Sequence, residues 1–216
     1  MRRKFMLIEE IALMLQKGRA QNVKQLVQQA LDEGYEPKDI LNGGLIQGMT
    51  VIGGKFKNNE VFVPEVLVAA RAMNAGLEIL RPALITSGIK PLGKAIICTV
   101  KGDLHDIGKN LVKMMLEGQG IECLDLGVDV SPEQVVEAVK DYKPDLVCLS
   151  ALLTTTMMAQ KETIDALKEA GIRDKVKVLI GGAPVTESFA KEIEADGYAG
   201  DAASAAQVAK AFLTGE

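Results

Sequence analysis

The sequence predicts an α/β protein in which a helical bundle precedes a parallel β-sheet covered by helices. Up to about residue 86, hydrophobic residues recur with the period of an α-helix, and from residue 95 onwards short apolar runs alternate with helical stretches. Residues 87–93 contain glycine and proline in a pattern that is typical of a linker. We therefore expect a bundle over residues 1–88 and a sheet domain over residues 93–216.

Four helical stretches are expected in the first part. They span residues 8–15, 23–31, 37–56 and 64–80. Gly34 ends the second stretch, because glycine adopts the left-handed conformation that closes many helices. Pro37 and Pro64 stand where the third and fourth stretches begin, and Pro82 lies near the end of the fourth. Because the connections are short, we expect an antiparallel four-helix bundle.

Apolar runs in the second part have the length of β-strands. They lie at residues 95–100, 121–126, 145–150 and 176–180, with a weaker run near 197–200, and helical stretches lie at 108–118, 132–142, 156–170, 186–194 and 203–213. Strands that alternate with helices form parallel sheets with helices on both faces. Ser131 and Gln134 form a capping box around Pro132, which predicts one helix start. We expect a five-stranded, doubly wound, Rossmann-like sheet with the flavodoxin-like strand order.

Composition and charge narrow the classes of function. The chain of 216 residues has a net charge of −4, an aromatic content of 4% and no Trp, which argues against nucleic-acid binding. No uncharged apolar window approaches a length of about 18 residues, so we expect no membrane span. Glu9 and Glu10 interrupt the apolar stretch behind the N-terminal arginines, so we expect no export signal and a cytoplasmic protein. The three cysteines lie in strand-like runs and are interpreted as buried, reduced thiols.

Three short motifs follow predicted strands. Residues 102–108 read Gly-Asp-Leu-His-Asp-Ile-Gly and contain the one histidine of the chain, His105; Ser150-Ala151-Leu152 and Gly181-Gly182 end two later strands. Ligands of doubly wound sheets bind beyond the carboxyl ends of the strands, where the strand order reverses. We therefore expect the three motifs at one edge of the sheet. Taken singly, a lone histidine is more often polar surface, and a Gly-Gly pair is more often a tight turn.

In this order and spacing, the three motifs resemble the cobalamin-binding motif of base-off/His-on corrinoid proteins. The resemblance implies that His105 is the lower axial ligand of cobalt, that Asp103 accepts a hydrogen bond from its second ring nitrogen, and that Thr156 extends this chain. The dimethylbenzimidazole tail would enter a slot beside the sheet, where glycine backbone can approach a flat ring. The residues that the resemblance assigns to cofactor binding in this part are Gly102, Asp103, Leu104, His105, Asp106, Ile107, Gly108, Ser150, Leu152, Thr154, Thr156, Gly181 and Gly182.

Some residues near these motifs also have simpler interpretations. The threonine run at residues 154–156 could form a helix N-cap. Asp106 and Asp129 are interpreted as solvated or capping residues. The two methionines that follow the threonine run are interpreted as packing.

The helical part resembles the cap that precedes the cobalamin domain in methionine synthase and in methyltransferase corrinoid proteins. The residues that carry this resemblance are Gly48, Met49, Gly53, Phe56, Glu60, Phe62, Pro64, Ala70, Arg71 and Met73. It implies that Phe56 and Val63 cover the upper face of the corrin and shield a methyl group. The alternative is that both side chains belong to the core of the bundle.

The resemblance implies a methyl carrier that is not a complete enzyme by itself. Cob(I)alamin would take a methyl group from a substrate-specific methyltransferase, and methyl-cob(III)alamin would pass it to a second methyltransferase that uses coenzyme M or tetrahydrofolate. A reductive activase would be a further partner, and the donor stays open among methylamines, methanol, betaines and aryl methyl ethers. One alternative is a cobalamin-responsive sensor. A sensor needs an output element, and the expected cap and sheet domain account for the residues of this chain. The other is the cobalamin subunit of an adenosylcobalamin mutase, which usually lacks the bundle.

Overall fold

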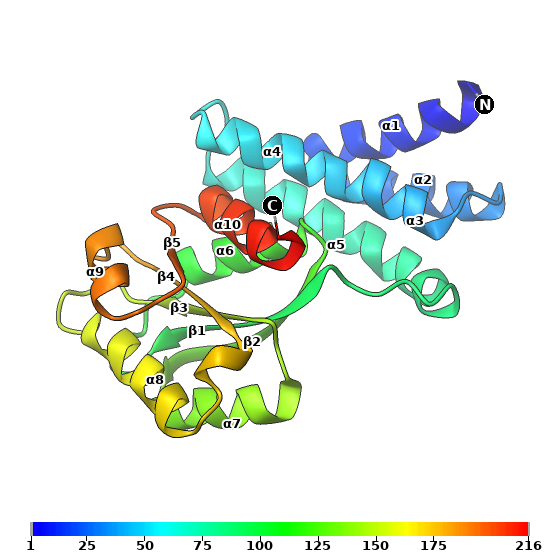
Figure 1. Cartoon of the computed structure of the whole chain (residues 1–216). Coiled ribbons are helices and arrows are strands. Elements are labelled where there is room, and N and C mark those ends of the chain that lie inside the picture. Colours follow the sequence, from blue (N-terminus) through cyan, green and yellow to red (C-terminus); the bar gives the residue numbers. More distant parts are fainter. Residues whose placement is uncertain (1, 216) are drawn as a thin grey trace. The chain divides into compact units, whose positions relative to one another are not determined.

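The computed structural model describes residues 2–215, with side chains from Met6 onwards, and it divides into two compact units. One unit comprises Met1–Lys90 and Gly118–Gly120, and the other comprises Pro91–Glu117 and Ile121–Glu216. Figure 1 shows the order of the elements within each unit. Within residues 2–215, no helix is long and apolar enough to cross a membrane.

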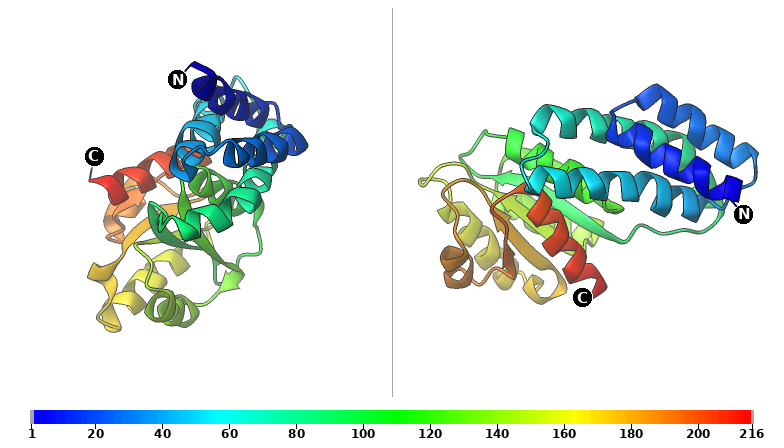
Figure 2. Two further views of the ribbon diagram at one scale, coloured as in Figure 1. Left: turned by 90° about the vertical axis from the view of Figure 1, so that its right-hand side faces the viewer. Right: turned by 90° about the horizontal axis from the view of Figure 1, so that it is seen from above.

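The first unit is a bundle of helices. It consists of α1 (Arg2–Gln16), α2 (Ala20–Asp32), α3 (Pro37–Asp39), the π-helix η1 (Ile40–Ile46), α4 (Gln47–Lys57) and α5 (Val63–Thr86). Its long helices lie side by side (Figure 2). Each contributes fully or almost fully buried apolar side chains, such as Leu15 on α1, Val27 on α2, Ile52 on α4 and Leu80 on α5. The helical period of the sequence therefore places one apolar stripe of each helix in the core.

Two details of the bundle differ from the prediction. The stretch predicted as one helix over residues 37–56 contains the seven-residue π-helix η1. A Cβ added to Gly43 or Gly44 within it would lie 2.8 or 3.0 Å from isoleucine methyl carbons of α1, so α1 packs directly against this backbone. In addition, α5 continues beyond Pro82 to its last residue, Thr86, whose hydroxyl donates to the Pro82 carbonyl over 2.9 Å.

The second unit is a five-stranded parallel sheet with the order β2-β1-β3-β4-β5. Its elements are β1 (Gly93–Val100), α6 (Ile107–Glu117), β2 (Ile121–Val130), α7 (Pro132–Tyr142), β3 (Leu146–Ser150), α8 (Met158–Glu169), the 3₁₀ turn η2 (Arg173–Lys175), β4 (Lys177–Gly181), α9 (Glu187–Glu192), β5 (Gly197–Tyr198) and α10 (Ala202–Thr214). Figure 1 shows α7 and α8 on one face of the sheet and α6 and α10 on the other. The predicted fold class and the flavodoxin-like strand order are confirmed.

The core of the sheet unit explains how its helices are attached. Buried side chains of the central strands, such as Ile96 and Leu149, pack with Val139 of α7 and with Ile164 and Leu167 of α8. At the start of α7, Ser131 accepts a hydrogen bond from the Gln134 amide, and the Gln134 side chain accepts one from the Ser131 amide. The capping box predicted from the sequence is therefore present.

Strand β2 extends further than the apolar run predicted. The run ends at residue 126, but β2 reaches Val130 because its register against β1 shifts twice. Ile97 pairs with Asp125, the next residue of β1 pairs with Gly127, and Val100 pairs with Val130. Such bulges let a strand continue through residues that do not alternate. The extension brings polar residues of β2 beside the loop that follows β1.

Candidate functional site

The three sequence motifs meet at the carboxyl edge of the sheet. The first forms the loop between β1 and α6, and the other two end β3 and β4. Ser150 pairs in register with Thr99 on β1 and with Gly181 on β4. The expectation of one common edge follows from the parallel strands and is met for all three motifs.

Asp103 is the centre of this edge. Its side chain is completely buried and accepts hydrogen bonds from Thr156 Oγ1 at 2.6 Å, Leu152 N at 2.7 Å, and the His105 amide at 3.1 Å. His105 Nδ1 lies 2.7 Å from Asp103 Oδ1. Burial alone would raise the pKa of Asp103, but the hydrogen bonds from Thr156, Leu152 and His105 together hold it well below its usual value. Asp103 is therefore a carboxylate that only accepts.

This carboxylate determines the tautomer of His105. Because Asp103 Oδ1 can only accept, the proton of the neutral ring lies on Nδ1, and Nε2 keeps the lone pair that a metal requires. The backbone of His105 is also held, since the buried Thr99 hydroxyl donates to the His105 carbonyl over 2.8 Å. The His105 side chain is 51% exposed, whereas its partner is inaccessible. The ring is therefore held at Nδ1 by the buried Asp103, and about half of its surface remains accessible to solvent.

The glycine pair at the end of β4 lies against the backbone that follows β3. Gly182 has φ of +129°, and a Cβ built on it would lie 1.7 Å from the Ala151 carbonyl oxygen. A Cβ on Gly181 would lie 3.1 Å from the Ala199 carbonyl oxygen. The Ala151 amide donates to the Gly181 carbonyl over 3.2 Å. The pair therefore keeps two main-chain segments in close contact at this edge. A slot for the dimethylbenzimidazole tail requires such close contact, and an ordinary tight turn would show it as well.

Apolar side chains on the same loops remain exposed to solvent. Leu104 and Ile107, on either side of His105, are 71% and 77% exposed. Leu152 and Leu153, beside the amide that binds Asp103, and Met158 at the start of α8 are also exposed. Exposed apolar side chains grouped around one polar residue indicate a binding surface. An imidazole with exposed apolar side chains on the same loops fits the flat, mostly apolar face of a corrin with a metal at its middle.

The remaining predicted residues are placed as follows. Thr156 joins Asp103, whereas Thr154 is exposed in the turn that precedes α8. The N-cap position of α8 is Met157, so the threonine run does not cap this helix. Asp106 precedes α6, and its carbonyl accepts from the Asn110 amide over 2.8 Å. Gly108 lies exposed in the first turn of α6.

Phe56 and Val63 belong to the helical unit. Phe56 lies near the end of α4 and Val63 is the first residue of α5, and both are half-buried. That they cover the cofactor stays a prediction.

Three polar residues at or near this edge have contacts that the sequence did not predict. Asp129 is exposed, as expected, and in addition its Oδ1 accepts a hydrogen bond from the Gly102 amide at 2.7 Å. The buried Gln160 donates to the Leu149 and Gly181 carbonyls, each over 3.0 Å, and so joins β3 to β4. No sequence signal distinguishes Gln160 from an ordinary polar helix residue.

Lys109, directly behind the histidine motif, is the third missed residue. Its side chain is 3% exposed, and Nζ lies 2.7 Å from both carboxylate oxygens of Asp125 on β2. Asp125 also accepts from the Gly127 amide over 2.9 Å. Burial raises and the Lys109 hydrogen bond lowers the pKa of Asp125, and the net shift is downward. The pair fastens the start of α6 to β2.

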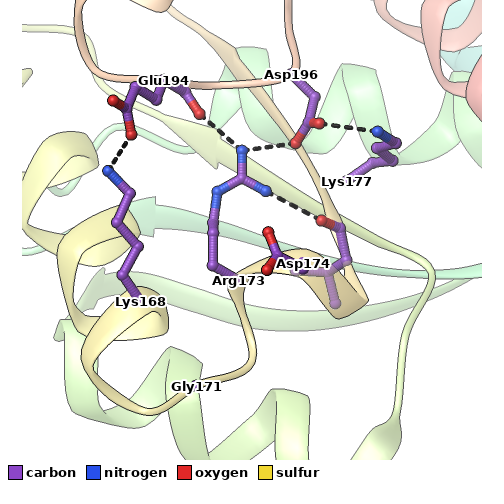
Figure 3. A pocket seen from close by; sticks show the side chains of 8 residues that line it. Lys168, Gly171, Arg173, Asp174, Lys177, Glu194 and Asp196 are labelled. Carbon is purple, nitrogen blue, oxygen red and sulfur yellow. Dashed lines mark hydrogen bonds and ion pairs between the residues drawn. The ribbon is translucent and has the colours of Figure 1, made fainter.

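The opposite edge of the sheet contains a cavity of about 550 Å³, which Figure 3 shows. Its cations are paired: Lys168 with Glu194, and Arg173 and Lys177 with Asp196. Arg173 donates further to main-chain carbonyls, so this network stabilises the turns before β4 and β5. It therefore has the character of structural ion pairing and is not the candidate site.

Comparison with known proteins identifies the domains of the chain and its relatives. Residues 93–209 match the model of a B12 binding domain, and residues 7–81 match a second B12 binding domain model. A corrinoid protein of Desulfitobacterium hafniense is 40% identical over 210 residues, 96% of this chain and 97% of the relative. Monomethylamine corrinoid protein 2 of Methanosarcina acetivorans is 47% identical over 189 residues, 86% of this chain and 87% of the relative.

Solved structures are similar over nearly the whole chain. The crystal structure of the methanol:cobalamin methyltransferase complex of Methanosarcina barkeri contains a chain with a TM-score of 0.85 and 36% identity, covering 97% of this chain and 80% of that one. A cobalamin-binding protein of D. hafniense has a TM-score of 0.79 and 31% identity, with 95% and 98% covered. The chain therefore belongs to the corrinoid protein family, whose B12 binding domains it carries, and its cofactor is cobalamin.

Proposed function

We propose that this chain is a methyl carrier that receives a methyl group from one methyltransferase and delivers it to another. The observation that carries the proposal is the hydrogen-bond chain from Thr156 through Asp103 to His105, which presents Nε2 at the open edge of the sheet. When bound, cobalamin supplies the nucleophilic metal and the site of methyl attachment. No described side chain is needed as nucleophile in this scheme.

The residues of this chain control how strongly the imidazole donates to the metal. A carboxylate on Nδ1 makes the ring more basic at Nε2 and fixes its orientation. Thr156 and the Leu152 amide satisfy the other oxygen of Asp103, so the carboxylate cannot turn away. Asp103, hydrogen-bonded to Nδ1, would also stabilise positive charge on the ring in any state in which Nε2 does not bind a metal.

The partners follow from the relatives. These include monomethylamine and trimethylamine corrinoid proteins, and the similar solved chain belongs to a methanol:cobalamin methyltransferase complex. By this analogy the chain takes its methyl group from a substrate-specific methyltransferase for a small methylated compound. A second methyltransferase, to coenzyme M or tetrahydrofolate, and a reductive activase complete the proposed system. The Phe56 and Val63 side chains are proposed to shield the methyl group.

The axial ligand is tested by electron paramagnetic resonance of the Co(II) protein. Because the chain has one histidine, protein labelled with [15N]histidine and loaded with unlabelled cobalamin should show a nitrogen doublet instead of the triplet of unlabelled protein. His105→Ala should bind cobalamin without this splitting. A triplet that persists in the labelled protein would identify benzimidazole as the ligand and would refute the proposal.

The carrier role is tested separately. Reduced holoprotein mixed with methylamines or methanol should gain no methyl group at a useful rate until a methyltransferase is added. Donor-specific turnover by the pure chain would make it an enzyme. Stable binding of adenosylcobalamin with rearrangement chemistry would favour the mutase alternative.

A further inference from the structure

We propose that Asp129 is a positioning residue for the axial histidine, acting through the turn that carries Asp103. The proposal rests on the function proposed above, because it concerns the strength of metal ligation by His105. Asp129 lies on β2, outside all three sequence motifs, and it contacts the turn instead of the ring. Its role is to hold the turn in one conformation and one place.

The turn has a conformation that needs an external partner. The Asp103 amide donates to the Val100 carbonyl over 3.1 Å, which closes a four-residue turn, and Gly102 at its third position has φ of +83°. A positive φ at the third position is the signature of a type II turn. The conformation orients the Gly102 amide, which is the group that Asp129 binds.

Asp129 holds the turn by two hydrogen bonds to consecutive residues. Its Oδ1 accepts from Gly102 N at 2.7 Å, and its own amide donates to the Asp103 carbonyl over 3.0 Å. The first is a charge-assisted bond of short length, and such bonds are about twice as strong as neutral ones. Since Val130 pairs with Val100 in the ladder, Asp129 lies directly beside the turn. The strand thus acts as a fixed support for the turn.

The backbone of Asp129 is adapted to this task. Its φ is +53°, a left-handed conformation that is uncommon for residues other than glycine. Within residues 2–215, the other such residues, Asn59, Lys143 and Glu194, follow the ends of helices, whereas Asp129 lies inside a strand. Helix ends often adopt this conformation, but strands do not. Unusual backbone held by its surroundings is concentrated at functional sites.

The support reaches His105 through one residue. Asp103 contacts the ring at Nδ1 with a bond of 2.7 Å, and its own main chain is the acceptor for the Asp129 amide. If the turn moves, the carboxylate moves with it, and the ring loses its orientation. The hydrogen bonds from Thr156 and Leu152 hold the carboxylate from the segment between β3 and α8. Asp103 is therefore fixed from two sides, by its side chain against that segment and by its main chain against β2.

The test uses two substitutions of Asp129 and one matched control. Asp129→Gly keeps the positive φ and the amide donor but removes the carboxylate, and Asp129→Asn keeps a neutral acceptor. Glu194→Gly makes the same chemical change at another left-handed acid, which pairs with Lys168 at the far edge of the sheet. All three proteins are loaded with cobalamin, and the imidazole-ligated fraction is measured from the Co(II) spectrum. In the cofactor-free proteins, the chemical shift and hydrogen exchange of the Gly102 amide are measured by NMR.

The expected result is specific to Asp129. Asp129→Gly should still bind cobalamin, but the ratio of ligated to unligated imidazole should fall by about fivefold or more, and the Gly102 amide should shift upfield and exchange about tenfold faster, in line with one lost charge-assisted hydrogen bond. Asp129→Asn should lie between this variant and the wild type, and Glu194→Gly should match the wild type in both measurements. A wild-type imidazole fraction in Asp129→Gly would overturn this inference alone. Absence of imidazole ligation in the wild type would refute the proposed function as well.

Discussion

Replacement of Gly182 by alanine is expected to destabilise the site strongly. Gly182 has φ of +129°, which lies in a region that is essentially restricted to glycine. The added Cβ would lie 1.7 Å from the Ala151 carbonyl oxygen and 2.7 Å from its carbonyl carbon, whereas ordinary contacts begin near 3.4 Å. Because both are main-chain atoms of the segment after β3, no side-chain rotation can relieve the clash.

The expected loss of stability follows from what must move. The backbone conformation itself costs about 1–3 kcal/mol for a residue with a Cβ. The ends of β3 and β4 must also separate. This breaks the hydrogen bond from the Ala151 amide to the Gly181 carbonyl and the hydrogen bond from the Gln160 side chain to the same carbonyl, each worth about 1 kcal/mol. We expect Gly182→Ala to lower the free energy of unfolding by about 4 kcal/mol or more. Cobalamin affinity should fall with it, because the glycine edge is displaced.

Urea unfolding of the cofactor-free protein measures this loss, and Gly171→Ala is the matched control. Gly171 also has a positive φ, +67°, but nothing lies within 4 Å of its added Cβ. That variant should lose only about 1–2 kcal/mol, the cost of the left-handed conformation. If the two substitutions cost the same, backbone conformation alone accounts for Gly182, and the argument from close approach at the site is wrong.

Three further predictions concern the polar groups and thiols. Asp103→Asn should lower the free energy of unfolding of the cofactor-free protein by about 1–3 kcal/mol, because the amide presents a donor to groups that also donate. The pKa of Asp103 in the folded protein lies below its usual value, so the stability that this carboxylate contributes is present above about pH 4 and is lost as the pH falls further. The urea midpoint of Asp103→Asn should therefore fall less between neutral and acid pH than that of the wild type. Lys109→Met should cost about 3–5 kcal/mol by leaving Asp125 partly buried without its main cation, and replacing both residues by apolar ones should recover much of this; an equal loss in the double variant would contradict it. The thiols should react with a disulfide reagent slowly before unfolding and fully after it, because burial raises the pKa of Cys98 and Cys123 to about 12; rapid reaction of the folded protein would show that the strands are accessible.

Local signals in the sequence predict most of the fold. Hydrophobic periods distinguish the bundle from the sheet, and the capping box at Ser131 marks a helix start because its bonds join residues three positions apart. The alternation of strands and helices predicted a parallel sheet covered on both faces, and the expected flavodoxin-like strand order agrees with the observed one. The errors have local causes too: the run that predicted β2 ended where glycine and aspartate interrupt it, and the π-helix η1 carries the same apolar residues as an α-helix.

The sequence by itself determined that its three motifs meet at one edge of the sheet. His105 lies in the loop that follows β1, and Ser150 and Gly181 end β3 and β4; parallel strands bring their carboxyl ends to one edge whatever the details of packing. The hydrogen bond between the His105 ring and the Asp103 carboxylate was also predicted, because the two residues are only two positions apart in the same loop.

Only the tertiary structure decided how these residues are held. The carboxylate of Asp103 is supported by Thr156, 53 residues later in the chain, and its main chain by Asp129 on β2. The second contact exists because two register shifts carry β2 past the end of its apolar run. Gln160 joins two strands whose pairing no local pattern specifies. Hydrogen bonds between distant segments depend on strand register and on burial, and both arise only when the sheet has formed.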